Sequence, residues 1–231
     1  MLPVITRDSI EPSNPVALRV EKAFELALNG QSKIPADLLA LQGMSGQKYR
    51  KFINNLVELT PDASYLEVGS WAGSTLCSAI HNNKVRAMAI DNWSEFGGPR
   101  DQFSANVGKF AGPSAAVSFL NSDFRAVRFD AIGTFNIYLF DGPHSKKDQY
   151  DGMALAKPAL DDVSVVIVDD WNWLEVRNGT FDALRDAQYQ ILHRIEVLST
   201  PDNRHPGDHG LPRDQDSDWH NGYFIGVLRK L

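Results

Sequence analysis

Two adjacent aspartates follow one of the most apolar segments of the chain. The segment VSVVIV, residues 163–168, leads directly into Asp169 and Asp170. Two ionised carboxylates side by side repel each other, and burying either one without a partner costs several kcal/mol. The pair therefore requires a compensating partner.

Acidic residues follow other apolar segments in the same way. Asp91 ends RAMAID, Asp123 follows AAVSFL, and Asp141 ends FNIYLFD. In open α/β sheets, ligands bind beyond the carboxyl ends of the strands, where the strand order reverses. Acidic residues at four successive strand ends predict one acidic edge of a binding cleft.

A glycine-containing turn precedes this acidic series. The segment LEVGSWAGST combines an acidic residue, two glycines and two hydroxyl residues that open a helix: Glu67, Gly69, Gly73, Ser74 and Thr75. Glycine permits a tight turn and close approach of the backbone to a ligand, and a helix N-terminus suits a carboxylate or phosphate. Asp91, 24 positions after Glu67, suits the two hydroxyls of a ribose. Alternatively, the glycines only permit the turn; a nicotinamide cofactor is a weaker interpretation because G-x-G-x-x-G is absent.

The elements that must position these residues alternate along the chain. Helical periodicity covers residues 14–59, in a first helix that stops at 29–30 and a second over 45–59. Beyond residue 64, seven apolar runs predict strands at 65–69, 86–91, 115–120, 135–141, 163–170, 191–198 and 223–230. Helical patterns near 74–82, 101–110, 145–159 and 179–190 separate most of them. This alternation predicts a doubly wound α/β fold with a seven-stranded, mainly parallel sheet and an antiparallel last strand.

We expect a single structural domain. Residues 1–60 would form an N-terminal helical segment packed on the core, and residues 61–231 would form the ligand-binding part. The segment 199–221 is rich in Pro, Gly and Asp and carries three of the six histidines. A loop of this length is usually functional or mobile, so a lid over the substrate and a disordered excursion are both open.

Composition excludes several classes of function. The chain has 231 residues, 43% hydrophobic and 23% charged, which is ordinary for a globular protein. A net charge of −6 argues against a nucleic-acid partner and against docking on an anionic membrane. Cys77 is the single cysteine, which favours a reducing compartment, and we interpret it as a packing residue. With no apolar leader or membrane-span pattern, we expect a cytoplasmic protein; a homo-oligomer stays open.

Together these motifs resemble those of class I S-adenosylmethionine-dependent methyltransferases, which have a Rossmann-like fold. LEVGSWAG resembles the first motif of that family, AIDNW its second-strand acidic position, and FDGPHS its fourth-strand motif. The chain is most similar to metal-dependent O-methyltransferases of the macrocin and catechol groups. Those enzymes place an acid at the fourth strand end and an acidic or amide pair at the fifth. The similarity covers roughly residues 43–171.

The resemblance implies a cofactor site for S-adenosylmethionine. Its residues would be Glu67, Gly69, Ser70 and Gly73 along the methionine portion, Thr75 at the carboxylate, Asp91 at the ribose, Asn92 and Trp93 at the sugar or adenine edge, Asp123 near the adenine amino group, and Asp141. Met44 and Ser45 are weaker candidates, because related enzymes bring an N-terminal segment over the cofactor.

The resemblance also implies a partner that compensates the charges of the paired aspartates. Asp141, Asp169 and Asp170 would converge on one point, and three carboxylates favour a hard dication such as Mg²⁺. The ion would offset their repulsion and lower the pKa of a substrate hydroxyl. Alternatively, Asp169 caps a turn and Asp170 lies in solvent.

His144, three positions after Asp141, is the predicted general base, and both are assigned to catalysis. An imidazole can accept a proton at neutral pH, although His144 could instead only cap the next helix. Trp171, Trp173 and Trp219 are candidates for an apolar wall around the acceptor.

The sequence therefore predicts an O-methyltransferase that acts, with Mg²⁺, on the hydroxyl of a small molecule such as a sugar, a catechol or another natural product. Two alternatives are a non-catalytic module that binds the cofactor or serves assembly, and a Rossmann-like oxidoreductase.

Overall fold

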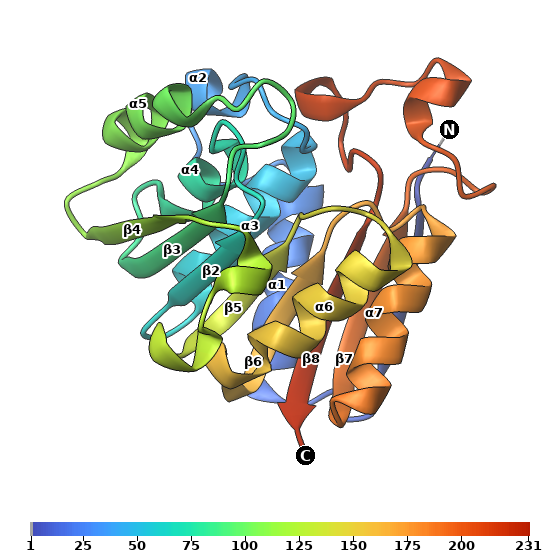
Figure 1. The fold of residues 1–231 in the computed structure, drawn as a ribbon. Coiled ribbons are helices and arrows are strands. Elements are labelled where there is room, and N and C mark those ends of the chain that lie inside the picture. The colour runs from blue at the N-terminus through green and yellow to red at the C-terminus, as the bar shows by residue number, and fades with distance from the viewer. Residues whose placement is uncertain (1) are drawn as a thin grey trace.

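A computed structural model describes residues 2–231 as a three-layer α/β/α fold around one eight-stranded sheet (Figure 1). The strands are β1 (Val4–Ser9), β2 (Ser64–Val68), β3 (Val85–Asp91), β4 (Ala115–Asn121), β5 (Phe135–Phe140), β6 (Leu160–Val168), β7 (Tyr189–Leu198) and β8 (Tyr223–Lys230). The helices are α1 (Pro15–Leu28), α2 (Ala36–Leu39), α3 (Gln47–Leu59), α4 (Ser74–Ile80), α5 (Arg100–Phe110), α6 (Lys146–Ala156) and α7 (Leu174–Asp186). None of the helices within residues 2–231 is long and apolar enough to cross a membrane.

The sheet has the order β1-β7-β8-β6-β5-β2-β3-β4. Strands β2 to β6 are parallel, whereas β8 lies antiparallel between β6 and β7. The predicted doubly wound, mainly parallel sheet with an antiparallel last strand is confirmed. Because β3 lies on one side of β2 and β5 on the other, the strand order reverses at β2, which is where such folds bind ligands.

Three details differ from the sequence-based prediction. Residues 4–9, assigned to an N-terminal helical segment, form β1, so the sheet has eight strands and not seven. The prediction missed β1 because VITRDS is mostly polar, as suits an edge strand. Helix α7 begins at Leu174 and not near 179, and β7 begins at Tyr189 and not at 191.

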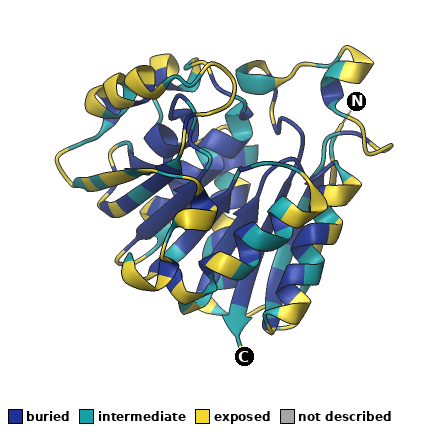
Figure 2. Cartoon of the chain, viewed as in Figure 1, coloured by how far each residue is buried: buried dark blue, intermediate teal, exposed yellow. Residues whose placement is uncertain are grey.

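Apolar residues at helical spacing attach the helices to the sheet. In α1, Val20 and Phe24 are fully buried, and the Phe24 ring meets Phe52 of α3 edge-on at 6.0 Å. Asn14 caps α1 by accepting a hydrogen bond from Val16 N–H at 2.9 Å, and Pro15 supplies a favourable first residue. Helices α1, α3 and α4 cover one face of the sheet, and α6 and α7 cover the other. Figure 2 shows the buried strands between helices whose outer faces are exposed.

Candidate active site

A cavity of about 560 Å³ opens at the carboxyl ends of β2, β3, β5 and β6. Seven of the predicted site residues line it: Gly69, Asp91, Asn92, Asp123, Asp141, His144 and Asp170. The other six predicted residues do not line the cavity and are buried: Glu67, Ser70, Gly73, Thr75, Trp93 and Asp169. The predicted site residues therefore divide between the cavity wall and buried positions next to it.

Asp91 fixes the turn between β2 and α4. Its Oδ2 accepts the N–H groups of Ser70 and Trp71, both at 2.8 Å, and its Oδ1 accepts Trp93 N–H at 2.6 Å. A carboxylate has about four lone-pair positions, so about one is left for a ligand hydroxyl. Asp91 is thus a structural anchor of the turn as well as a candidate ribose ligand.

Both glycines of the turn have a positive φ, as a tight turn requires, and each packs closely against a neighbouring element. Gly69 has φ +86°, and a Cβ there would lie 1.8 Å from the carbonyl oxygen of Asp141, so this glycine lets the ends of β2 and β5 approach each other. Gly73 has φ +85°, and its Cβ would meet the Phe103 ring at 3.0 Å. The structure therefore shows Gly73 packed against α5, and its predicted approach to a ligand stays untested.

Glu67 lies fully buried behind the turn. Its Oε2 accepts the hydroxyl of Tyr65, whereas Oε1 has no hydrogen-bond partner. Burial raises the pKa of Glu67 to about 7, although the Tyr65 hydrogen bond acts in the opposite direction. An unpaired buried acceptor fits a cationic donor, such as the ammonium group on the methionine portion of S-adenosylmethionine. The residues at this end of the cavity thus fit the predicted cofactor.

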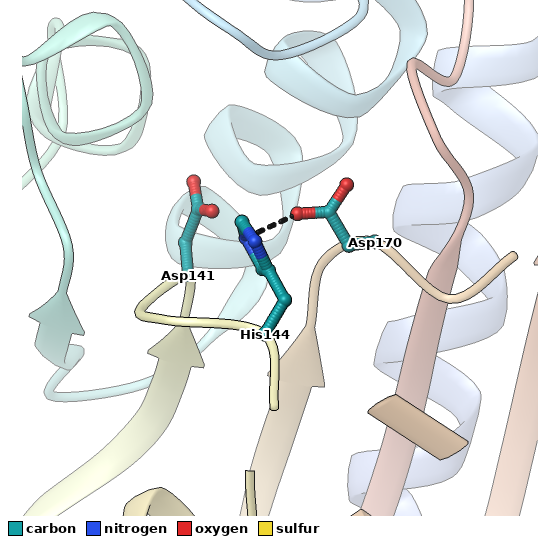
Figure 3. A group of neighbouring side chains, drawn as sticks. All are labelled: Asp141, His144 and Asp170. Carbon is teal, nitrogen blue, oxygen red and sulfur yellow. Dashed lines mark ion pairs between the residues drawn. The ribbon is translucent and has the colours of Figure 1, made fainter. Parts of the chain in front are cut away.

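Asp141, His144 and Asp170 meet at the cavity wall (Figure 3). Asp141 follows β5, His144 lies in the loop before α6, and Asp170 follows β6. His144 Nε2 lies 2.6 Å from Asp170 Oδ2, and Asn221 donates to Asp170 Oδ1 at 2.7 Å. One ligand atom from each of the three residues lies within 4.8 Å of the other two.

The ionisation of this group follows from its contacts. Burial, the largest influence, would raise the pKa of Asp170, but the contact with His144, the charge of His220 and the Asn221 hydrogen bond together lower it. Burial alone would lower the pKa of His144, but the same pairing raises it. Both shifts follow from one contact, in which Nε2–H of His144 donates to the carboxylate of Asp170.

Asp169 behaves differently from its neighbour. It is buried, and its Oδ1 accepts the N–H of Asp170 at 2.7 Å. Burial and the negative charge of Asp170 raise the pKa of Asp169 well above its usual range. Within residues 2–231, Asp170 is therefore paired with His144, whereas Asp169 is a buried acid with a raised pKa. The structure groups His144, and not Asp169, with Asp141 and Asp170.

The 199–221 loop, called the lid below, borders the cavity and contains two short 3-10 segments, Pro206–His209 and Asp214–Asp216. Four of its residues line the cavity, and the sequence predicted none of them as a site residue: His205, Arg213, Asp214 and His220. No local pattern marks them, since they come from the far end of the chain.

The remaining candidates divide between wall and core. Trp173 lines the cavity with its ring centroid 4.9 Å from that of His144, whereas Trp171 and Trp219 are buried in the core. His209 pairs with Asp202 at 3.0 Å and is not part of the wall. Cys77 is fully buried, as its interpretation as a packing residue requires.

Comparisons with known proteins agree with this arrangement. Residues 66–171 match a family described as "Methyltransferase domain". No curated protein matches the chain.

Solved structures share the fold at low sequence identity. A methyltransferase from Podospora anserina with bound S-adenosylhomocysteine is 10% identical, with a TM-score of 0.56 over 92% of this chain and 88% of the other. A candidate O-methyltransferase from Klebsiella pneumoniae is 14% identical, with a TM-score of 0.51 over 95% and 92%. TrmN from Thermus thermophilus is 14% identical, with a TM-score of 0.54 over 84% of this chain and 52% of the other, so this chain spans about half of its length.

The fold and the matched segment define the class of protein. Residues 66–171 carry a methyltransferase domain, and the chain has a Rossmann-like methyltransferase fold. It is an enzyme of the methyl-transfer class, EC 2.1.1, and the oxidoreductase alternative receives no support.

Proposed function

We propose that this enzyme transfers a methyl group to the hydroxyl of a small molecule, with His144 as the general base and Mg²⁺ as an auxiliary ion. The observation that carries the proposal is the contact of 2.6 Å between His144 Nε2 and Asp170 Oδ2 at the cavity wall. A hydroxyl is a poor nucleophile until a base removes its proton. The pair supplies a base that is oriented by a carboxylate.

The roles of the residues follow from their contacts. Because Nε2 of His144 faces Asp170, Nδ1 is the nitrogen left to accept the proton of the acceptor. Asn221 holds the other oxygen of Asp170 and so fixes the carboxylate that orients the imidazole. S-adenosylmethionine, when bound, supplies the methyl group on a sulfonium that becomes a neutral thioether. The proton of the acceptor hydroxyl ends on His144.

The metal proposal rests on Asp141 and Asp170. Burial and repulsion from Asp169 and Asp170 raise the pKa of Asp141 well above its usual range, so a cation near these carboxylates would be stabilising. Mg²⁺ would be held by the oxygens of Asp141 and Asp170, with His144 in reach as a further ligand. The ion would supply Lewis-acid polarisation of the acceptor oxygen.

The acceptor class follows from the shape and charge of the cavity. A volume of about 560 Å³ suits the cofactor and a small acceptor, and the lid restricts access. The Trp173 ring offers a flat apolar surface to a sugar or aromatic ring. The acidic wall, with Asp91, Asp141 and Asp170 among its residues, opposes a polyanion such as nucleic acid.

The proposal is tested by assaying methyl transfer from S-adenosylmethionine to a panel of sugars, catechols and other alcohols. On an accepted substrate, His144→Ala should lower kcat by roughly 10²–10⁴-fold with little change in cofactor affinity. The matched control is His209→Ala, since His209 is a lid histidine outside the cavity wall. A His144→Ala enzyme with the wild-type rate would remove the base from the proposal.

The metal is tested separately, by chelation. EDTA should reduce the rate, and added Mg²⁺ should restore it. An undiminished rate in excess chelator would remove the metal from the proposal and leave the base unaffected.

A further inference from the structure

Arg50 of α3 is a buried cation with no acidic hydrogen-bond partner. Its side chain is fully buried, and its hydrogen bonds reach four neutral oxygens. Nε donates to Ser45 Oγ at 2.9 Å, Nη1 to the carbonyls of Leu39 and Leu41 at 3.0 and 2.6 Å, and Nη2 to the carbonyl of Gly43 at 3.1 Å.

Such a charge is costly. Carbonyl and hydroxyl oxygens satisfy the donors of the guanidinium but do not neutralise it, and burying an unneutralised ion costs several kcal/mol. Burial lowers the pKa of Arg50 to about 10, so the group is still charged at neutral pH. Its position therefore favours an anionic ligand nearby.

The four hydrogen bonds fix the segment 39–45 against the start of α4. Ser45 Oγ lies 3.3 Å from Ser74 Oγ, the first residue of α4. A Cβ on Gly43 would lie 2.1 Å from Ser74 Oγ and 3.1 Å from Arg50 Nη2, so these groups are packed closely. Met44, within the same segment, lines the cavity.

Arg50 and Glu67 thus bring opposite charges to the two sides of the turn between β2 and α4. Ser74 begins the helix that follows the glycine-containing turn, and Glu67 lies in the strand that precedes it. Glu67 Oε1 is buried without a hydrogen-bond partner, so it is free to accept a hydrogen bond from an ammonium group. A cation and an anion on either side of one turn match the carboxylate and ammonium of a free amino acid, which is how the methionine portion of the cofactor ends.

We propose that Arg50 is a positioning residue for the carboxylate of the cofactor. It acts through Ser45 and the segment 39–45, and its positive charge lets this enzyme select a cofactor that carries this carboxylate. The proposal rests on the use of S-adenosylmethionine and is independent of the acceptor and of the metal.

The test compares two unreactive ligands by calorimetry in the absence of an acceptor. One is S-adenosylhomocysteine, and the other is its decarboxylated form, in which hydrogen replaces the carboxylate. Wild-type protein should bind the first roughly 10–100-fold more tightly, the usual range for a charge-assisted contact. Arg50→Met should bring this ratio close to one, and Arg50→Lys should retain part of it. Lys51→Met, which removes a partly exposed cation next to Arg50 in α3, should keep the wild-type ratio.

Two results would overturn the proposal. The first is wild-type protein that binds both ligands equally, a measurement that does not depend on any variant being folded. The second is an Arg50 variant that weakens both ligands by the same factor, because that is the signature of a purely structural residue.

Discussion

At the scale of single residues, the site separates two carboxyl groups that are adjacent in the chain. Asp169 is buried and has a raised pKa, whereas Asp170 lies at the cavity wall, pairs with His144 and has a lowered pKa. Asp170 has a positive φ of +57°, so the chain turns sharply at the residue that pairs with His144.

Glu67 gives a prediction about pH. Its pKa is about 7 in the folded protein and 4.5 in a model peptide, so between these values the folded state holds a proton that the unfolded state has released. Stability contributed by this group is therefore present below pH 4.5 and is lost as the pH rises to about 7. An ammonium group beside Glu67 would favour its anion and expel the proton.

We therefore expect S-adenosylhomocysteine to release nearly one proton on binding at pH 6 and much less at pH 8. Calorimetry in buffers with different ionisation enthalpies measures this number. Glu67→Gln should abolish the release, whereas Glu95→Gln, at an exposed carboxylate of the same cavity, should not change it. Equal proton release by wild type and Glu67→Gln would show that Glu67 does not meet the ammonium group.

The sequence predicted part of this site for a physical reason. Asp141, His144 and Asp170 follow neighbouring parallel strands, whose carboxyl ends must meet at one edge of the sheet. Asn221 and Arg50 could not be predicted in the same way. Asn221 is 51 residues from Asp170, and Arg50 looks like an ordinary exposed helix residue until α3 is packed.

At the scale of elements, the side chain of Asn172 anchors the start of the lid. Asn172, which is fully buried, donates to Ser199 Oγ and Thr200 Oγ1, both at 2.9 Å, and to the carbonyl of Arg204 at 3.1 Å. Its Oδ1 accepts Ser199 N–H at 2.9 Å. Because Asn172 is two positions from Asp170, the start of the lid and the Asp170–His144 pair are held by the same turn.

Asn172→Leu should loosen the lid without unfolding the sheet. The substitution leaves several buried polar groups unpaired, at about 1–3 kcal/mol each. Residues 199–210 should become more sensitive to limited proteolysis, and the KM for the acceptor should rise. Leu174→Ala, at a side chain that is 55% exposed, is the matched control. Identical proteolysis of wild type and Asn172→Leu would mean that other contacts hold the lid.

The elements themselves were predictable where hydrophobic periodicity is strong. The apolar runs of β2, β5, β6 and β8 gave strands close to the observed bounds. Helix α7 was placed too late because its first turns contain Asn178 and Gly179, which are typical of loops, although Gly179 is buried against α6. In these first turns, the helical conformation is stabilised by the packing of α7 on α6 and not by local helix propensity.

At the scale of the whole molecule, two segments that are distant in the chain contact each other near the cavity: the start of α3 and the end of the lid. The N–H groups of Gln47 and Lys48 donate to the carbonyls of Ser217 and Asp218, at 2.7 and 2.9 Å. The segment that Arg50 holds and the lid that Asn172 holds are therefore in contact above the ends of the strands. Binding of the cofactor and closure over the acceptor can be coupled through this contact.

The far edge of the sheet should have no part in that coupling. Strand β1 pairs with β7 from Val4↔Leu198 to Ser9↔His193, at the opposite end of the sheet from β3 and β4, while the cofactor residues follow β2, β3 and β5. Removing residues 2–9 would expose the backbone of β7 and break the pair between Arg7 and Glu21. We expect the free energy of unfolding to fall by roughly 2–4 kcal/mol, as several strand hydrogen bonds and some apolar burial are lost. Urea unfolding measures this change, and calorimetry with S-adenosylhomocysteine should give an affinity within about threefold of wild type. An unchanged unfolding midpoint would show that β1 adds no stability. Loss of cofactor affinity in a folded truncated chain would show that the sheet edge and the site are coupled.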